Sequence, residues 1–173
     1  MTLQQASECA LNGNPIWAGG NPMKGGDNPF IGTWKLRSAV QEDEETGKKS
    51  YPLGTSPTDY LNYSPDGRMM VILVGDDRKA PAGPVATDAE MIALYKSVVA
   101  YAGTYAIDGN QVIHHVDASV NERTTATKLI RFFTLRDGLL ELITAPGPNR
   151  YDGRISVQTL VWEKMALSAS AER

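Results

Sequence analysis

The chain has 173 residues, a mass of 18.8 kDa and a formal net charge of −3, which predicts one acidic domain with a sizeable core. The lack of a basic run argues against nucleic acid or a membrane surface as a partner, and the single cysteine, Cys9, excludes an internal disulfide and a cysteine-based zinc site. No apolar stretch reaches the roughly 18 residues of a membrane span and no signal-peptide pattern is found, so we expect a cytoplasmic protein.

Residues 1–28, rich in Gly, Asn and Pro, predict an irregular N-terminal arm, and from residue 29 onward short alternating apolar runs predict strands. Four Asp-Gly pairs between these runs are typical of hairpin turns. Strands are expected near residues 31–41, 50–53, 59–65, 68–75, 103–108, 111–120, 127–136, 139–145 and 154–164. Such an antiparallel meander tends to close into a barrel, because closure removes exposed edges. The barrel is expected to span 29–165, followed by a C-terminal tail at 166–173.

One segment between these strands predicts a helix at about residues 88–102. The sequence TDAE at 87–90 has the pattern of a capping box, in which the first and last side chains each pair a free backbone N–H. Apolar residues then recur at helical spacing from Met91, and Gly103 ends the run. The neighbouring strand at 68–75 is apolar on both faces, which favours a strand whose outer face is covered, with this helix as the candidate cover.

The only two histidines, His114 and His115, are adjacent in the predicted strand at 111–120. Successive side chains of a strand point to opposite faces, so the two cannot share a metal ion, and no metal site is expected. His114 shares a face with valines, whereas His115 shares the other face with Asp117. An aspartate beside an imidazole raises its pKa and fixes its tautomer. If that face lines a cavity, the pair is an acid/base unit; if it faces solvent, the pair is a polar surface stripe.

Seven segments carry a resemblance to known proteins: IGTWKL at 31–36, YPLG at 51–54, DYLNYSPDGRMMVIL at 59–73, YAGTYAID at 101–108, VIHHVDAS at 112–119, RFF at 131–133 and LVWEK at 160–164. They come in the same order in the lipocalin-like domain family of small bacterial and fungal proteins, which the chain resembles over about residues 29–165. The resemblance implies an all-β fold, a closed antiparallel up-and-down barrel of eight or nine strands with an interior cavity. In the lipocalin Gly-x-Trp signature the tryptophan, here Trp34, plugs the closed end.

A basic residue often covers that tryptophan in lipocalins, and Arg131, which shares a face with Leu and Phe residues, is the first candidate for this contact. The alternative for Arg131 is that it binds a ligand carboxylate or enolate. The candidate ligand-binding residues are Trp34, Tyr63, Met70, Tyr101, Tyr105 and Phe133. Buried tyrosines need a partner for the hydroxyl, which a cavity wall provides, although ordinary packing is the alternative for each of them.

Two function classes stay open, both with a small hydrophobic molecule as the partner. One is a non-catalytic binding or carrier barrel. The other is a cofactor-independent cyclase or isomerase of the pericyclase kind, which we favour because an intracellular carrier usually delivers its ligand to something that this sequence does not show. It would act on a polyketide- or terpenoid-type intermediate, with His115, Asp117 and Arg131 as catalytic residues. Whether the chain also forms a homodimer is left open.

Overall fold

The computed structural model describes residues 28–150 and 152–166. The predicted arm and tail therefore lie outside the described residues, except for Asn28 and Ala166. The strands are β1 (Gly32–Asp43), β2 (Lys49–Ser50), β3 (Tyr60–Tyr63), β4 (Arg68–Val74), β5 (Val98–Asp108), β6 (Gln111–Ser119), β7 (Lys128–Arg136), β8 (Leu139–Thr144), β9 (Gly147–Pro148) and β10 (Ile155–Lys164). The helix α2 (Asp88–Lys96) lies between β4 and β5, and a short 3₁₀ turn, η1 (Glu122–Thr124), lies between β6 and β7.

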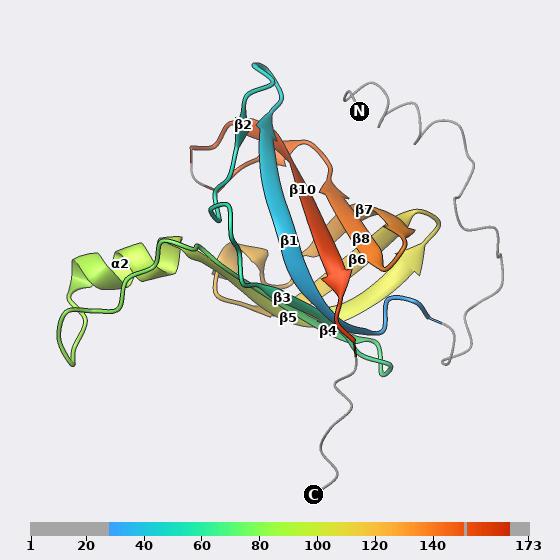
Figure 1. Cartoon of the computed structure of the whole chain (residues 1–173), viewed down its shortest axis with the longest axis horizontal. Coiled ribbons are helices and arrows are strands. Elements are labelled where there is room, and N and C mark those ends of the chain that lie inside the picture. The colour runs from blue at the N-terminus through green and yellow to red at the C-terminus, as the bar shows by residue number, and fades with distance from the viewer. Residues whose placement is uncertain (1–27, 151, 167–173) are drawn as a thin grey trace, which may run out of the picture.

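The strands form one antiparallel sheet in the order β2-β1-β3-β4-β5-β6-β7-β8-β10-β9, and a further pairing of β1 with β10 closes it. Eight strands make the closed barrel that curves around the interior in Figure 1, and the two-residue strands β2 and β9 flank it. Neighbours along the chain mostly pair with each other, as hairpin turns dictate. The predicted all-β closed barrel with one inserted helix is confirmed.

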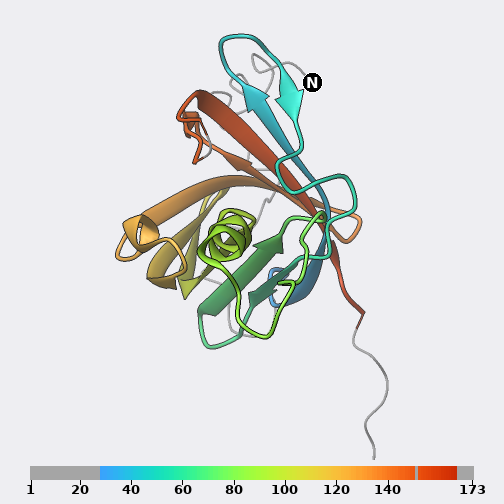
Figure 2. The same ribbon diagram turned by 90° about the vertical axis from the view of Figure 1, so that its left-hand side faces the viewer.

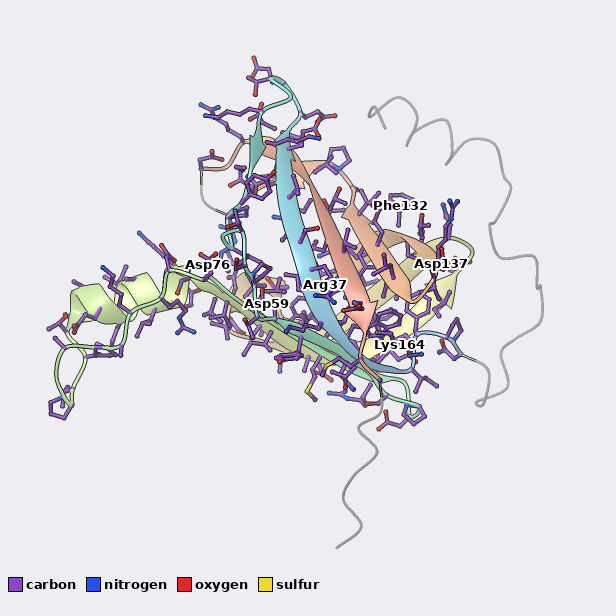
Figure 3. All side chains as sticks on the ribbon, viewed as in Figure 1. Arg37, Asp59, Asp76, Phe132, Asp137 and Lys164 are labelled. Atoms are coloured by element: carbon purple, nitrogen blue, oxygen red, sulfur yellow. The ribbon has the colours of Figure 1, made fainter. Side chains whose placement is uncertain are left out.

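Alternation along each strand sends the apolar side chains into the barrel, where they form a single core. Its closed end is built around Trp34, which is fully buried and donates its Nε1–H to the carbonyl of Phe30 over 2.8 Å. The Lys164 ammonium lies 5.3 Å from the centre of the Trp34 ring, because Lys164 is paired with Trp34 across β1 and β10. Figure 3 shows Lys164 at this end of β10. The covering cation is therefore Lys164, and the prediction that Arg131 would cover the tryptophan is wrong.

The helix is shorter than predicted and does not cover the sheet. The predicted capping box is present at Thr87 and Glu90, but α2 ends at Lys96 because Val98 already pairs with Val74 as the start of β5. The pairing of a β-branched run with β4 overrides the helical spacing of its residues. The helix projects away from the barrel in Figure 1, is seen end-on in Figure 2, and has no buried residue. The outer face of β4 is therefore exposed, including Met70 at 59%.

Candidate functional site

The two histidines lie on opposite faces of β6, as strand alternation requires, but the face that enters the barrel is the one with His114. His114 is 1% exposed and lies between the buried Val112 and Val116. His115 is paired across the sheet with exposed residues of β5 and β7, and Asp117 is exposed. The expectation that His115 and Asp117 project into a cavity is therefore wrong.

Asp117 is instead part of an ion pair on the outer surface. Both of its carboxylate oxygens accept from the Arg68 guanidinium, which reaches across from β4. The hydrogen bonds and charge of Arg68 lower the pKa of Asp117 below its ordinary value. An aspartate held by an arginine at the surface is not available to orient the imidazole of His115.

Inside the barrel, His114 is held by two tyrosines that sequence reasoning had proposed as pocket residues. The Tyr63 hydroxyl on β3 lies 2.7 Å from Nε2, and the Tyr101 hydroxyl on β5 lies 3.0 Å from Nδ1. Both ring nitrogens are therefore hydrogen-bonded, by residues 51 and 13 positions away in the chain. The signal that could have identified His114 was its apolar face, since a histidine between valines on a barrel strand points inward.

The cluster Tyr63–His114–Tyr101 is electrically neutral at physiological pH. Burial lowers the pKa of His114 to about 3, and the positive charge of Arg131 acts in the same direction. Burial raises the pKa of Tyr63 well above its ordinary value and also raises that of Tyr101. The ring of His114 is therefore an uncharged imidazole, with one N–H donor and one acceptor nitrogen.

Arg131 is the one predicted catalytic residue that reaches the interior. It pairs with the buried Val112 across β6 and β7, so its side chain lies on the inner face. Its charge and a hydrogen bond to the Tyr101 hydroxyl oppose the rise in the pKa of that tyrosine, and its Nη1 also donates to the Ile130 carbonyl over 2.9 Å. Arg131 therefore contacts the tyrosine–histidine cluster rather than the tryptophan.

The remaining predicted ligand-binding residues divide between the two faces. Tyr105 packs on Tyr63 with ring centres 4.7 Å apart, and its hydroxyl accepts from Asn28 and donates to the Ser64 carbonyl. Phe133 packs edge-on against Phe30 at 4.8 Å, beside the core. Trp34 is at the closed end. Met70 is the exception, because it follows the buried Met69 in β4 and so points outward, where it cannot line the interior.

A small cavity of about 40 Å³ lies inside the sheet, lined in part by Gln41, Leu53, Leu73, Val99, Gln158 and Leu160. This volume exceeds the roughly 10–15 Å³ that a cavity needs to hold one water molecule. Its wall residue Val99 is two positions before Tyr101 on the same face of β5, which places it about 7 Å along the strand from the cluster. Val99 in the cavity wall and Tyr101 in the cluster therefore share the inner face of β5, although no residue of the cluster lines the cavity itself.

Two searches for other kinds of site were confined to residues 28–150 and 152–166. No three His, Cys, Asp or Glu side chains there lie close enough to hold a metal ion. No helix among the same residues is both long enough and apolar enough to cross a lipid bilayer.

The comparison with protein families agrees with this architecture, because the model for the lipocalin-like domain matches residues 31–165. The chain belongs to the lipocalin-like domain family. Among solved structures, a lipocalin-like protein from Bacteroides uniformis is similar at 15% identity and a TM-score of 0.43, over 80% of this chain and 100% of its own. An uncharacterized protein from Bacteroides eggerthii is similar at 14% identity and a TM-score of 0.40, over 79% and 99%. The comparison with curated proteins finds no match.

Proposed function

We propose that this lipocalin-like barrel encloses a small hydrophobic molecule and acts on it as a cofactor-independent isomerase or cyclase. The molecule would be of the polyketide or terpenoid type. The observation that carries the proposal is the cluster Tyr63–His114–Tyr101, buried beside Arg131 in an interior that is otherwise largely apolar. The three side chains are tolerated in the core because they hydrogen-bond one another, and they bring polar groups to an apolar interior.

The chemistry that this cluster supports is the stabilisation of negative charge on a ligand oxygen. With a pKa of about 3, His114 is a weak base and would be poor at removing a proton from carbon near neutral pH. Tyr101 and Arg131, by contrast, are hydrogen-bond donors on the inner face, and preorganised donors in a water-poor site stabilise a developing oxyanion. A cyclisation or rearrangement of a carbonyl compound that proceeds without proton transfer increases the negative charge on the carbonyl oxygen, so it needs these donors and no base.

The second candidate function, a carrier, is favoured by the aliphatic residues in the cavity wall, such as Leu53, Leu73 and Val99. A carrier needs only burial of its ligand, whereas an enzyme needs the ligand oxygen to reach Tyr101. The two functions therefore differ in what loss of the Tyr101 hydroxyl does: a carrier keeps most of its affinity, and an enzyme loses its rate.

The experiment is to incubate the full chain with a panel of enones and β-dicarbonyl compounds of terpenoid and polyketide type in D₂O buffer. Isomer formation, ring closure and deuterium uptake are followed by mass spectrometry. The expected result is turnover of at least one compound, reduced about 10²–10³-fold in Tyr101→Phe. The control is Tyr60→Phe, which changes an exposed tyrosine on the outside of β3 and should keep the full rate. Binding of panel compounds without any turnover would establish the carrier instead.

A further inference from the structure

The burial of Tyr63 determines which groups donate and which accept in the hydrogen bonds of the cluster. A neutral imidazole donates from one nitrogen and accepts at the other, so one tyrosine donates to His114 and the other accepts from it. Tyr63 is fully buried, and Nε2 of His114 is the hydrogen-bond partner that the structure gives its hydroxyl. If Nε2 carried the proton, the Tyr63 proton would be left without an acceptor in the core, which is unfavourable. The arrangement that pairs both groups has Tyr63 donating to Nε2 and Nδ1–H donating to Tyr101.

With Tyr63 donating to His114 and His114 donating to Tyr101, the Tyr101 hydroxyl is the last group in this series of hydrogen bonds. Its oxygen accepts from Nδ1–H of His114, so its own proton is free to be donated to a further acceptor. The positive charge of Arg131 acts to lower the pKa of Tyr101, which favours the same donation. Tyr101 pairs with the buried Val71 across β4 and β5, so its side chain and this proton lie on the inner face of the barrel.

The charge of this part of the interior is positive. Among residues 28–150 and 152–166, none of the ion pairs involves Arg131. The fully buried carboxylate of the described interior, Asp59, accepts instead from the backbone N–H of Val74 over 2.6 Å. A guanidinium and a hydroxyl proton thus lie together next to apolar wall residues, and neither is opposed by a carboxylate. Covering them with a hydrocarbon alone would desolvate an unpaired cation.

We infer that the ligand of this barrel is an organic anion, a carboxylate or an enolate, whose oxygen accepts from both the Tyr101 hydroxyl and the Arg131 guanidinium. The inference rests on the proposed function, that the barrel encloses a small molecule, and adds its chemical class. The apolar body of the ligand would extend from Tyr101 along β5 towards the cavity wall at Val99 and Leu73. Guanidinium and hydroxyl donors that converge on one oxygen are suited to such an anion.

The test uses two molecules that share a chain and differ in charge, decanoate and 1-decanol, as competitors of the neutral fluorescent probe N-phenyl-1-naphthylamine. Each competitor is titrated against the full chain and against Arg131→Met, Arg131→Lys and Tyr101→Phe. The matched control is Arg136→Met, which removes an exposed arginine from the same strand. Displacement gives a Kd for each molecule and each variant at one pH and one salt concentration.

The expected result is that the wild type binds decanoate tighter than decanol and that Arg131→Met weakens decanoate about tenfold or more while decanol changes less than twofold. Arg131→Lys should recover part of the preference, Tyr101→Phe should lose part of it, and Arg136→Met should keep all of it. If Arg131→Met weakens the binding of both competitors equally, or leaves the preference for decanoate unchanged, the anion inference is wrong. The proposal that the barrel encloses a small molecule would not be affected by that result. If neither the probe nor a competitor binds the wild type, the proposed function falls together with the inference.

A second measurement needs no ligand. Long-range ¹H–¹⁵N correlation spectra report which nitrogen of a neutral imidazole carries the proton, and with two histidines in the chain His115→Gln assigns the signals. We expect the proton of His114 on Nδ1. A proton on Nε2 would reverse the chain of hydrogen bonds, would use the Tyr101 proton to satisfy His114, and would overturn the role given to Tyr101.

Discussion

His114 and His115 are adjacent in the chain, but they differ in burial and in hydrogen-bond partners. His114 is 1% exposed, is hydrogen-bonded at both nitrogens by tyrosines, and has a pKa lowered to about 3. His115 lies on the outer face, next to an ion pair between Asp117 and Arg68. The difference shows that the strand face enclosed by the barrel, rather than the polarity of the neighbouring residues, decides which histidine is buried.

The same contrast holds for carboxylates. Asp59, fully buried between β2 and β3, has a pKa raised to about 6 by desolvation, although its hydrogen bond from Val74 acts to lower it. Figure 3 shows Asp59 beside the strands of the barrel wall. Asp117, at the surface, has a pKa lowered by Arg68. Interior and exterior therefore shift the pKa of the same chemical group in opposite directions, and four sets of substitutions test how far this comparison extends.

The largest effect is expected from the interior plug. Trp34→Ala should lower the free energy of unfolding by about 3–5 kcal/mol, because it removes a fully buried aromatic ring and its hydrogen bond to Phe30. Met70→Ala, on the outer face, should change it by about 0.5 kcal/mol or less. Urea unfolding measures both. Comparable losses for the two variants would break the distinction between the faces.

Asp59→Asn should stabilise the protein above pH 6 by up to about 3 kcal/mol. The folded pKa of about 6 lies above the ordinary 3.8, so the folded state binds the proton more tightly, and stability declines as the pH rises from 4 to 6. Asparagine can still accept from Val74 but carries no charge, so it escapes this loss. Unfolding at pH 4 and pH 7.5 is the measurement. A gain that is the same at both pH values would contradict the pKa shift.

His114→Phe should cost about 2 kcal/mol, because it leaves two tyrosine hydroxyls without their partner in the interior. His115→Phe should cost well under 1 kcal/mol. Adding Tyr63→Phe to His114→Phe should recover part of the loss, since removing both partners of a buried hydrogen bond costs less than removing one. A double variant that is less stable than the sum of the single losses predicts would refute the pairing.

The sequence predicted the barrel, most of its strands, the buried Trp34 and the opposite faces of the two histidines, because these follow from alternation and turn chemistry. It placed the start of β5 at residue 103 instead of Val98, because the residues before 103 were assigned to the helix. It also selected Tyr63, Tyr101 and Arg131, which do meet inside. It attached them to the wrong histidine, because the polar face of the strand was interpreted as the cavity face. Arg68, 49 residues away from Asp117, satisfies that polarity from outside, and such a long-range pair is not visible in local spacing.

The pairing register of the strands was the other feature that the local sequence pattern could not predict. The pairing of β1 with β10 brings Lys164 to Trp34, from the far end of the domain. Beside the register shift between Ala102 and Gly103, β6 approaches closely because glycine has no side chain: a Cβ at Gly103 would lie 2.0 Å from the His115 carbonyl oxygen. That shift falls beyond Val116, so alternation holds through both histidines and is lost only after them.

The smallest effect is expected at the surface pair. Asp117→Asn should lower the Tm by no more than about 2 °C at low salt, because both members of the pair are exposed and water screens their attraction. The lowered pKa of Asp117 means that its contribution is present above the ordinary value of 3.8 and disappears as the pH falls below it. Arg68→Gln should act alike, and the double variant should lose no more than either single one. Melting curves at low and high salt test this. A large loss of stability, or a loss of ligand binding in Asp117→Asn, would show that the outer face of β6 takes part in the site after all.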